Sequence, residues 1–128
     1  MDKTTLVDTQ IEAGKKLVDA LDKSKFKIVG ALWFYYPASD EWKLLFASPL
    51  VDILGPTRCY NLILTILQDI GLDFQLFTNI SVLSPKDKLI QLLKTAIHTD
   101  NGISAIRFSR NTINGVFIED ALIYRLSD

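Results

Sequence analysis

The sequence of 128 residues predicts an α+β fold: a two-layer sandwich in which a largely antiparallel five-stranded sheet packs against three helices, mainly on one face. Segments with helical spacing of apolar residues alternate with runs rich in β-branched and aromatic residues, in the order α-β-β-α-β-α-β-β. This alternation is not interrupted by a repeat, a low-complexity tract or a Gly/Pro/Ser-rich linker. We therefore expect residues 1–128 to form a single domain.

A helix followed by a hairpin is predicted at the start of the chain. Apolar side chains at helical spacing indicate a helix over residues 4–23. Residues 26–36 and 42–47 have the composition of strands, and the segment between them has turn chemistry. We expect Tyr36 to lie opposite Trp42 in this hairpin.

This register sorts the side chains of the first hairpin onto two faces. The face expected to form the core carries Phe26, Ile28, Leu32, Phe34, Leu44 and Phe46. The opposite face is mixed in character and carries Lys27, Val29, Trp33, Tyr35, Lys43 and Leu45. With the helices mainly on one side, we expect the mixed face to remain open.

The middle of the chain predicts a helix, a strand and a further helix. Pro56 suits the first turn of the second helix, and Gly71 suits its end. Residues 74–83 are strand-like. Ser84 is the expected N-cap of the third helix, which should run to about His98.

The last segment carries the clearest signal. Asn114-Gly115 between the strand-like segments 104–113 and 116–126 is a strong indicator of a hairpin with a two-residue turn. The turn fixes the predicted cross-strand pairs: Ile113–Val116, Asn111–Ile118, Arg110–Glu119, Ser109–Asp120, Phe108–Ala121, Arg107–Leu122 and Ile106–Ile123.

Charge and composition exclude several classes of protein. With 14 basic and 15 acidic residues, the net charge of −1 argues against binding to duplex nucleic acid or to an anionic membrane by bulk electrostatics. No apolar run approaches the ~18 residues of a membrane span. One cysteine cannot form an internal disulfide, and no signal peptide is recognisable at the N-terminus. We therefore expect a soluble, cytoplasmic protein.

The sequence contains none of the common catalytic, metal-binding or cofactor-binding motifs, so we expect no metal and no cofactor. Cys59 falls on the apolar stripe of its helix, which favours a buried structural role. His98, at a helix end, is better suited to capping or to the surface than to catalysis. Asp52 lies in a predicted loop without an identifiable partner. Glu119 and Asp120 point to opposite faces of a strand and cannot chelate together.

A polar group on the final hairpin is the strongest candidate site. Arg107, Ser109, Asn111 and Asp120 share one strand face by parity, and Arg107 and Asp120 are close enough to interact. These residues could form an ordinary solvent-facing side of the sheet or a recognition patch.

The leading functional hypothesis is a non-catalytic interaction or self-associating module, acting as a homodimer or with a protein partner. Hydrophobic residues make up 48% of the chain, and Trp33, Tyr35 and Tyr124 are expected on the open sheet face, where aromatic residues serve as interface hot spots. The alternative is a small-ligand-binding protein or enzyme whose pocket is lined by the polar group of the final hairpin. A third hypothesis is single-stranded nucleic-acid binding by base stacking on exposed aromatic residues.

Overall fold

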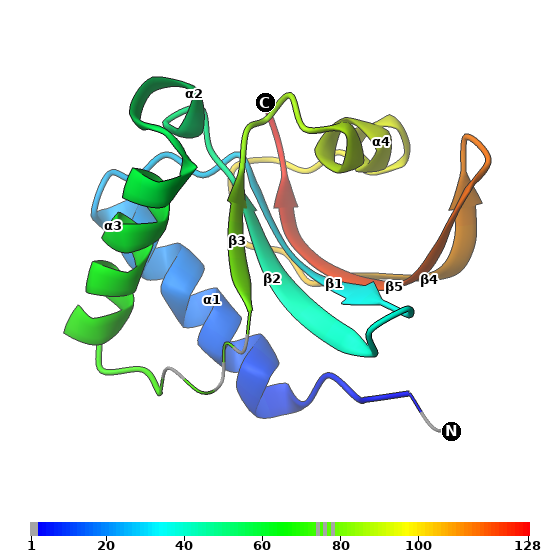
Figure 1. Ribbon diagram of the computed structural model, residues 1–128, viewed down its shortest axis with the longest axis horizontal. Coiled ribbons are helices and arrows are strands. Elements are labelled where there is room, and N and C mark those ends of the chain that lie inside the picture. Colours follow the sequence, from blue (N-terminus) through cyan, green and yellow to red (C-terminus); the bar gives the residue numbers. More distant parts are fainter. Residues whose placement is uncertain (1–2, 74, 76, 78) are drawn as a thin grey trace.

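The computed structural model describes residues 3–73, 75, 77 and 79–128 and has the predicted order of elements with one short helix added (Figure 1). The elements are α1 (Asp8–Lys23), β1 (Gly30–Tyr36), β2 (Glu41–Ala47), α2 (Val51–Leu54), α3 (Pro56–Asp69), β3 (Ile80–Leu83), α4 (Lys88–Ala96), β4 (Ile106–Ile113) and β5 (Val116–Leu126). The described part of the chain thus has four α-helices, not three. The added helix α2 occupies a predicted loop, where the Ser48 hydroxyl accepts a hydrogen bond from the Leu50 N–H and starts a single turn.

The sheet is mixed, not largely antiparallel. Its strand order is β3-β2-β1-β5-β4, and β1 pairs antiparallel with both β2 and β5, as β4 does with β5. Strand β3 pairs parallel with β2. The segment between them, which includes α2 and α3, returns the chain to the starting end of β2, so β3 must run in the same direction.

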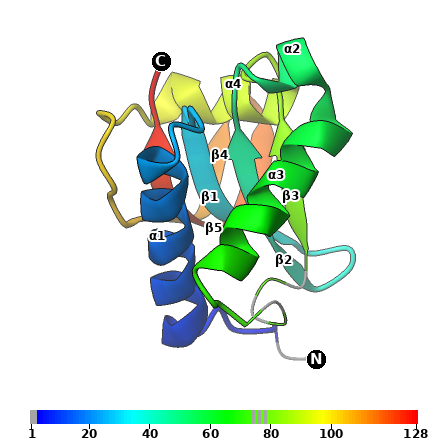
Figure 2. The same cartoon turned by 90° about the vertical axis from the view of Figure 1, so that its left-hand side faces the viewer.

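Helices cover both faces of the sheet (Figures 1 and 2). Helices α1 and α3 lie on one face, and α4 lies on the other. The first core includes Leu17, Leu21, Trp33, Tyr35, Trp42, Leu44, Phe46, Ile63, Leu122 and Tyr124. The second includes Val29, Leu32, Phe34, Leu45, Ile90, Leu93, Ile118 and Ile123. The expectation that helices on one side leave an open apolar face is therefore wrong.

The register of the first hairpin differs by one residue from the prediction. Tyr36 lies opposite Glu41, and Tyr35 lies opposite Trp42. A shift of one residue moves a strand's side chains to the opposite face. Trp33 and Tyr35 therefore share the face of Trp42, under α1 and α3, instead of the face opposite to it.

Helix α1 packs closely on the sheet at a glycine. Its buried residues recur at helical spacing, and Gly14 lies among them. A Cβ atom at Gly14 would stand 2.2 Å from the Tyr124 Oη, so glycine is required for this approach.

Several predicted segments are shorter in the structure than in the sequence analysis, and the difference is clearest in the middle of the chain. The predicted strand 74–83 is observed as β3 only over Ile80–Leu83, and positions 74, 76 and 78 lie outside the described residues. Helix α4 begins at Lys88 and ends at Ala96. Its N-cap is Asp87, whose carboxylate accepts the Leu89 N–H at 2.9 Å, and not Ser84.

The final hairpin has the predicted register at every pair except one. The pairs from Ile113–Val116 to Ile106–Ile123 are confirmed, but Arg110–Glu119 is not among the ladder pairs of the described chain. Arg110 has a φ of 44°, which interrupts the regular strand geometry. Asn114 and Gly115 have φ values of 47° and 80°, as a type I′ turn requires.

Candidate functional site

The predicted polar group assembles around one buried carboxylate. Asp120, on β5, accepts hydrogen bonds at 2.7 Å from the Arg107 Nε, the Arg107 Nη2 and the Ser109 Oγ. Arg107 and Ser109 reach it from neighbouring positions of β4, as strand parity predicts. Asn111 does not join them: it is exposed, and its side-chain oxygen accepts the N–H of Thr112.

Lys3 completes this group, and sequence reasoning missed it. The Lys3 Nζ lies 2.6 Å from the Asp120 Oδ2. The same ammonium group lies 4.9 Å from the ring centroid of Tyr35 and 5.7 Å from that of Trp42. No local pattern connects residue 3 with residue 120, because the contact depends on the path of the chain before α1.

The residue that follows Lys3 is also fixed to the sheet. The Thr4 N–H and Oγ1 both donate to the Asp40 carboxylate, at 2.9 and 2.8 Å. The Thr4 carbonyl accepts the Trp42 Nε1 at 2.9 Å. The N-terminal arm, defined here as residues 3–6, therefore runs across the turn between β1 and β2 (Figure 1).

These contacts determine the protonation of the groups around Lys3. Burial raises the pKa of Asp120, but the hydrogen bonds from Arg107, Lys3 and Ser109 outweigh it and hold the pKa well below its usual range. The hydrogen bond to Asp40 raises the pKa of Tyr35 to about 12, assisted by burial and by the charges of Asp40 and Glu119. Asp120 is thus an ionised acceptor with four hydrogen bonds, which suits ion pairing and not proton transfer.

The aromatic residues predicted on an open face are buried. The Trp33 Nε1 donates to the Tyr124 Oη at 2.9 Å, and the Tyr124 hydroxyl donates to the carbonyl of Ile11 on α1 at 2.7 Å. Burial raises the pKa of Tyr124 above its usual value. Trp33 and Tyr124 therefore connect β1 and β5 to α1, and an interaction surface has to lie elsewhere.

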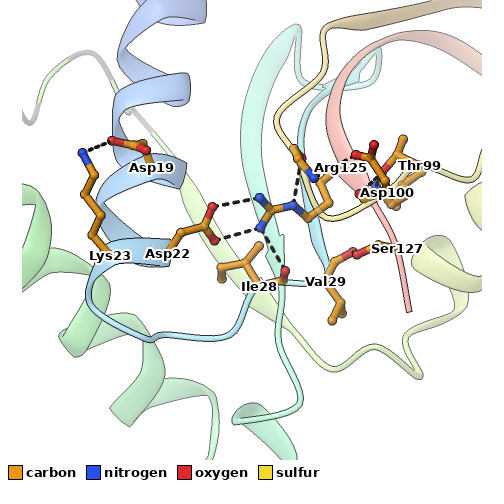
Figure 3. Close-up of polar contacts among 11 residues, drawn as sticks. Asp19, Asp22, Lys23, Ile28, Val29, Thr99, Asp100, Arg125 and Ser127 are labelled. Carbon is orange, nitrogen blue, oxygen red and sulfur yellow. Dashed lines mark hydrogen bonds and ion pairs between the residues drawn. The ribbon is translucent and has the colours of Figure 1, made fainter.

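A second polar cluster surrounds Arg125, near the end of β5 (Figure 3). Its guanidinium group binds both carboxylate oxygens of Asp22, at 2.9 and 2.8 Å. It also donates to the backbone carbonyls of Ile28 and Gly102, each at 3.1 Å. Sequence reasoning missed this cluster, although an arginine among the apolar residues of a predicted strand signals a buried ion pair.

The Arg125 cluster borders a shallow cavity of about 320 Å³. Lys25 and Lys27 line this cavity together with the Asp22 and Asp128 carboxylates, so both signs of charge are present. Three segments meet at Arg125: the end of α1, the residues just before β1 and the loop around Gly102. Arg125 therefore holds these three segments together inside the protein.

The other candidates for chemistry lie apart from these clusters. Cys59 lies on the buried side of α3, and burial raises the pKa of its thiol. His98 follows α4 on the other side of the sheet and lies 3.3 Å from the Asp128 carboxylate at the surface. The Asp52 carboxylate accepts the Ser84 hydroxyl at 3.0 Å.

Residues 3–73, 75, 77 and 79–128 contain neither a cluster of candidate metal ligands nor a helix that could span a membrane. No group of three or more His, Cys, Asp or Glu side chains in this part of the chain could hold a metal ion. No helix of the same residues is long and apolar enough to cross a membrane.

Strand β4 forms an edge of the sheet and is largely exposed. The edge strand on the opposite side, β3, has four residues against eight in β4. Four exposed large apolar side chains belong to this hairpin or to the loop before it: Ile103 in the loop, Ile106 at the start of β4, and Val116 and Phe117 on β5 beside the turn. The free edge and these side chains are the most accessible apolar feature near the polar group.

Comparisons of the chain with protein families, with curated proteins and with solved structures found no match.

Proposed function

We propose that this protein is a non-catalytic interaction module that binds an extended segment of a partner protein along β4. The observation that carries this proposal is the free edge of β4, an eight-residue strand whose outer backbone groups have no neighbouring strand among the described residues. Proteins recognise extended peptides by adding them to such an edge, where main-chain hydrogen bonds supply affinity. Natural sheets usually protect long edges, and β4 does so only in part, through its arginines and the irregularity at Arg110, so the rest of the edge remains available to a partner.

The side chains around β4 indicate the chemistry of this partner. Strand β4 contains Arg107 and Arg110 and no acidic residue. Pairing with a second β4 would therefore place arginines near arginines, and like charges across a ladder are destabilising. An acidic extended segment with apolar side chains complements both the arginines and the exposed Ile106 and Phe117.

The two other hypotheses have weaker support. A ligand-binding or catalytic role for the polar group would need a free functional group, but Asp120 already accepts four hydrogen bonds from Lys3, Arg107 and Ser109. Binding of single-stranded nucleic acid would need exposed aromatic platforms. Trp33 and Tyr35, which were expected to provide them, are buried.

The test compares variants of the full chain in affinity purification from the source cells, followed by hydrogen exchange on the recovered complex. The two variants called β4 variants here are Arg110→Glu, on β4 itself, and Phe117→Asp, on β5 directly opposite Thr112 of β4. The control Ile53→Asp changes a side chain that is 76% exposed on α2. We expect a partner that is retained by wild type and by the control and lost by both β4 variants, because only these variants alter the binding edge.

Hydrogen exchange then identifies the mode of binding. Strand addition should slow the exchange of backbone amides within Ile106–Ile113, since they gain hydrogen bonds to the partner. A partner that binds all variants equally, or that leaves these amides unprotected, would contradict the proposal. Light scattering tests self-association of the wild-type protein. If wild type is a dimer and both β4 variants are monomers, β4 binds a second copy of the chain. That result would overturn the assignment of an acidic partner.

A further inference from the structure

The surroundings of Lys3 resemble a binding site more than a surface ion pair. Its ammonium group lies over the rings of Tyr35 and Trp42 and contacts the carboxylate of Asp120. We call these three residues the ammonium cage. Aromatic faces combined with an anion are the means by which proteins recognise lysine and other ammonium groups.

The walls of the cage have supports that do not depend on Lys3. Tyr35 and Trp42 lie opposite each other on β1 and β2, with ring centroids 5.3 Å apart. The Tyr35 hydroxyl donates to Asp40 at 2.6 Å. Asp120 keeps its two bonds from Arg107 and the one from Ser109 if Lys3 leaves. Because the buried carboxylate stays neutralised, departure of Lys3 does not leave an unpaired buried charge.

The electrostatic environment of the cage favours a cation. A cavity of about 260 Å³ adjoins it, lined by Thr4, Gln10, Asp40, Glu41, Trp42 and Asn79. This lining includes two carboxylates and, as far as the chain is described, no Lys or Arg. Glu119 is also near enough to act on Tyr35. Asp120 contacts the cations of Lys3 and Arg107, and three further carboxylates, those of Asp40, Glu41 and Glu119, lie near Tyr35 or line the adjoining cavity.

The contacts of Thr4 show how an extended segment fits beside the cage. Its backbone N–H and carbonyl bind Asp40 and Trp42, and these backbone groups are common to nearly all residues. The contacts that depend on side chains are those of the Lys3 ammonium group, the Thr4 hydroxyl and the buried Leu6 of the arm. The Lys3 side chain remains 35% exposed, so the cage opens to solvent.

We infer that Tyr35, Trp42 and Asp120 form a recognition site for the ammonium group of a lysine in an extended protein segment, which Lys3 of the N-terminal arm occupies in the isolated chain. The arm is then an internal competitor, and a lysine supplied by another chain binds by displacing it. This site lies on the sheet face that α1 and α3 cover, and it does not depend on the proposed role of the β4 edge. The competing lysine can come from a different protein or from the arm of a second copy.

The experiment uses the full chain with Lys3→Ala and follows the two indole N–H signals by NMR during titration with n-butylammonium chloride. The Trp42 indole belongs to the cage, whereas the Trp33 indole is bound to Tyr124 and serves as an internal control. We expect saturable movement of the Trp42 signal in the variant. Wild type should require about tenfold more ligand, because Lys3 occupies the cage. Butan-1-ol, which has the same chain length without the charge, should produce no saturable change.

Two further measurements complete the test. The variant Lys3→Gln keeps a polar side chain at this position and should bind n-butylammonium as Lys3→Ala does, which covers the case that the alanine variant folds poorly. Light scattering over a concentration series separates the sources of lysine, since arm exchange between copies produces a dimer that Lys3→Ala abolishes. Equal responses of wild type and both variants to n-butylammonium, or equal responses to n-butylammonium and butan-1-ol, would overturn the inference.

Discussion

Strand β5 carries two buried residues of opposite charge, and each pairs with a partner that stays in contact with solvent. The Asp120 side chain is 4% exposed and its partner Arg107 is 48% exposed. At the other cluster the buried member is the base: Arg125 is 3% exposed, and Asp22 is 39% exposed. The two ion pairs therefore have the same construction with the charges reversed.

The two clusters differ in what supports the buried charge. Asp120 accepts all of its four hydrogen bonds from side chains, those of Lys3, Arg107 and Ser109. Arg125 has one carboxylate partner and two backbone carbonyls. The buried acid has two cationic neighbours that can replace each other, whereas the buried base has a single anionic neighbour. We infer that the Arg125 cluster is a fixed brace and that the Asp120 cluster can exchange partners.

The largest expected effect comes from removing the single counter-charge of Arg125. Asp22→Asn leaves a buried guanidinium group without an anion, and such changes lower the free energy of unfolding by about 3–5 kcal/mol. Urea denaturation followed by far-UV circular dichroism measures the loss. If the protein is one domain, the variant should still unfold in a single transition. If the free energy of unfolding hardly changes, water stabilises the charge of Arg125 as effectively as Asp22 does.

The matched change at the other cluster should be milder. Arg107→Met removes the exposed partner of Asp120, but Lys3 and Ser109 remain bound to it. We expect the free energy of unfolding to fall by about 1–3 kcal/mol, the range for lost hydrogen bonds at a buried acceptor. The same urea denaturation measures it.

The double variant with Lys3→Met sharpens this test. It leaves Asp120 without any cation, so its loss should exceed the sum of the two single losses. Two results would contradict the contrast between the two clusters. One is that Arg107→Met lowers the free energy of unfolding as much as Asp22→Asn does. The other is that the effects of Arg107→Met and Lys3→Met are strictly additive.

The smallest expected effect is a dependence on acid pH that arises from Asp120. Its pKa in the folded protein lies below the unfolded value of about 3.9. The ionised form therefore contributes stability that is fully present above the unfolded pKa and is lost as the pH falls through the folded pKa. We expect the difference in unfolding free energy between wild type and Asp120→Asn to be constant near neutral pH and to shrink below about pH 4.

Urea midpoints of both proteins over a pH series provide the measurement. Asp40 and Asp128 also have lowered pKa values, but they are present in both proteins and cancel in the difference. A difference that stays constant down to the acid limit would show that Asp120 has no role in the pH dependence.

Local patterns in the sequence were sufficient for the element order and for the final hairpin. The turn at Asn114-Gly115 fixed the register from Ile113–Val116 to Ile106–Ile123, and this register brought Arg107 and Ser109 to Asp120 as predicted. Only two residues lie in that turn, so little freedom was left for the pairing. The burial of Cys59 likewise followed from the helical spacing of apolar residues.

The first hairpin lacked such a constraint. Its longer turn allowed two registers that differ by one residue, and the sequence contained no feature that excluded either. The difference decided whether Trp33 and Tyr35 shared a face with Trp42 or lay opposite to it. The placement of α4 decided whether the other sheet face is open. Its Ile90 and Leu93 cover this face, which no helix was expected to cover.

The sequence by itself determined the alternation of elements, the pairing of β4 with β5 and the polar group on that hairpin, because each depends on residues close together in the chain. The tertiary structure alone decided which sheet face each helix covers, the parallel pairing of β3 with β2, and the arrival of Lys3 at Asp120 and of Asp22 at Arg125. The two ion pairs join residues that are 117 and 103 positions apart in the chain. Their energies arise only when the packed layers bring the charges out of water together, and no local spacing encodes that.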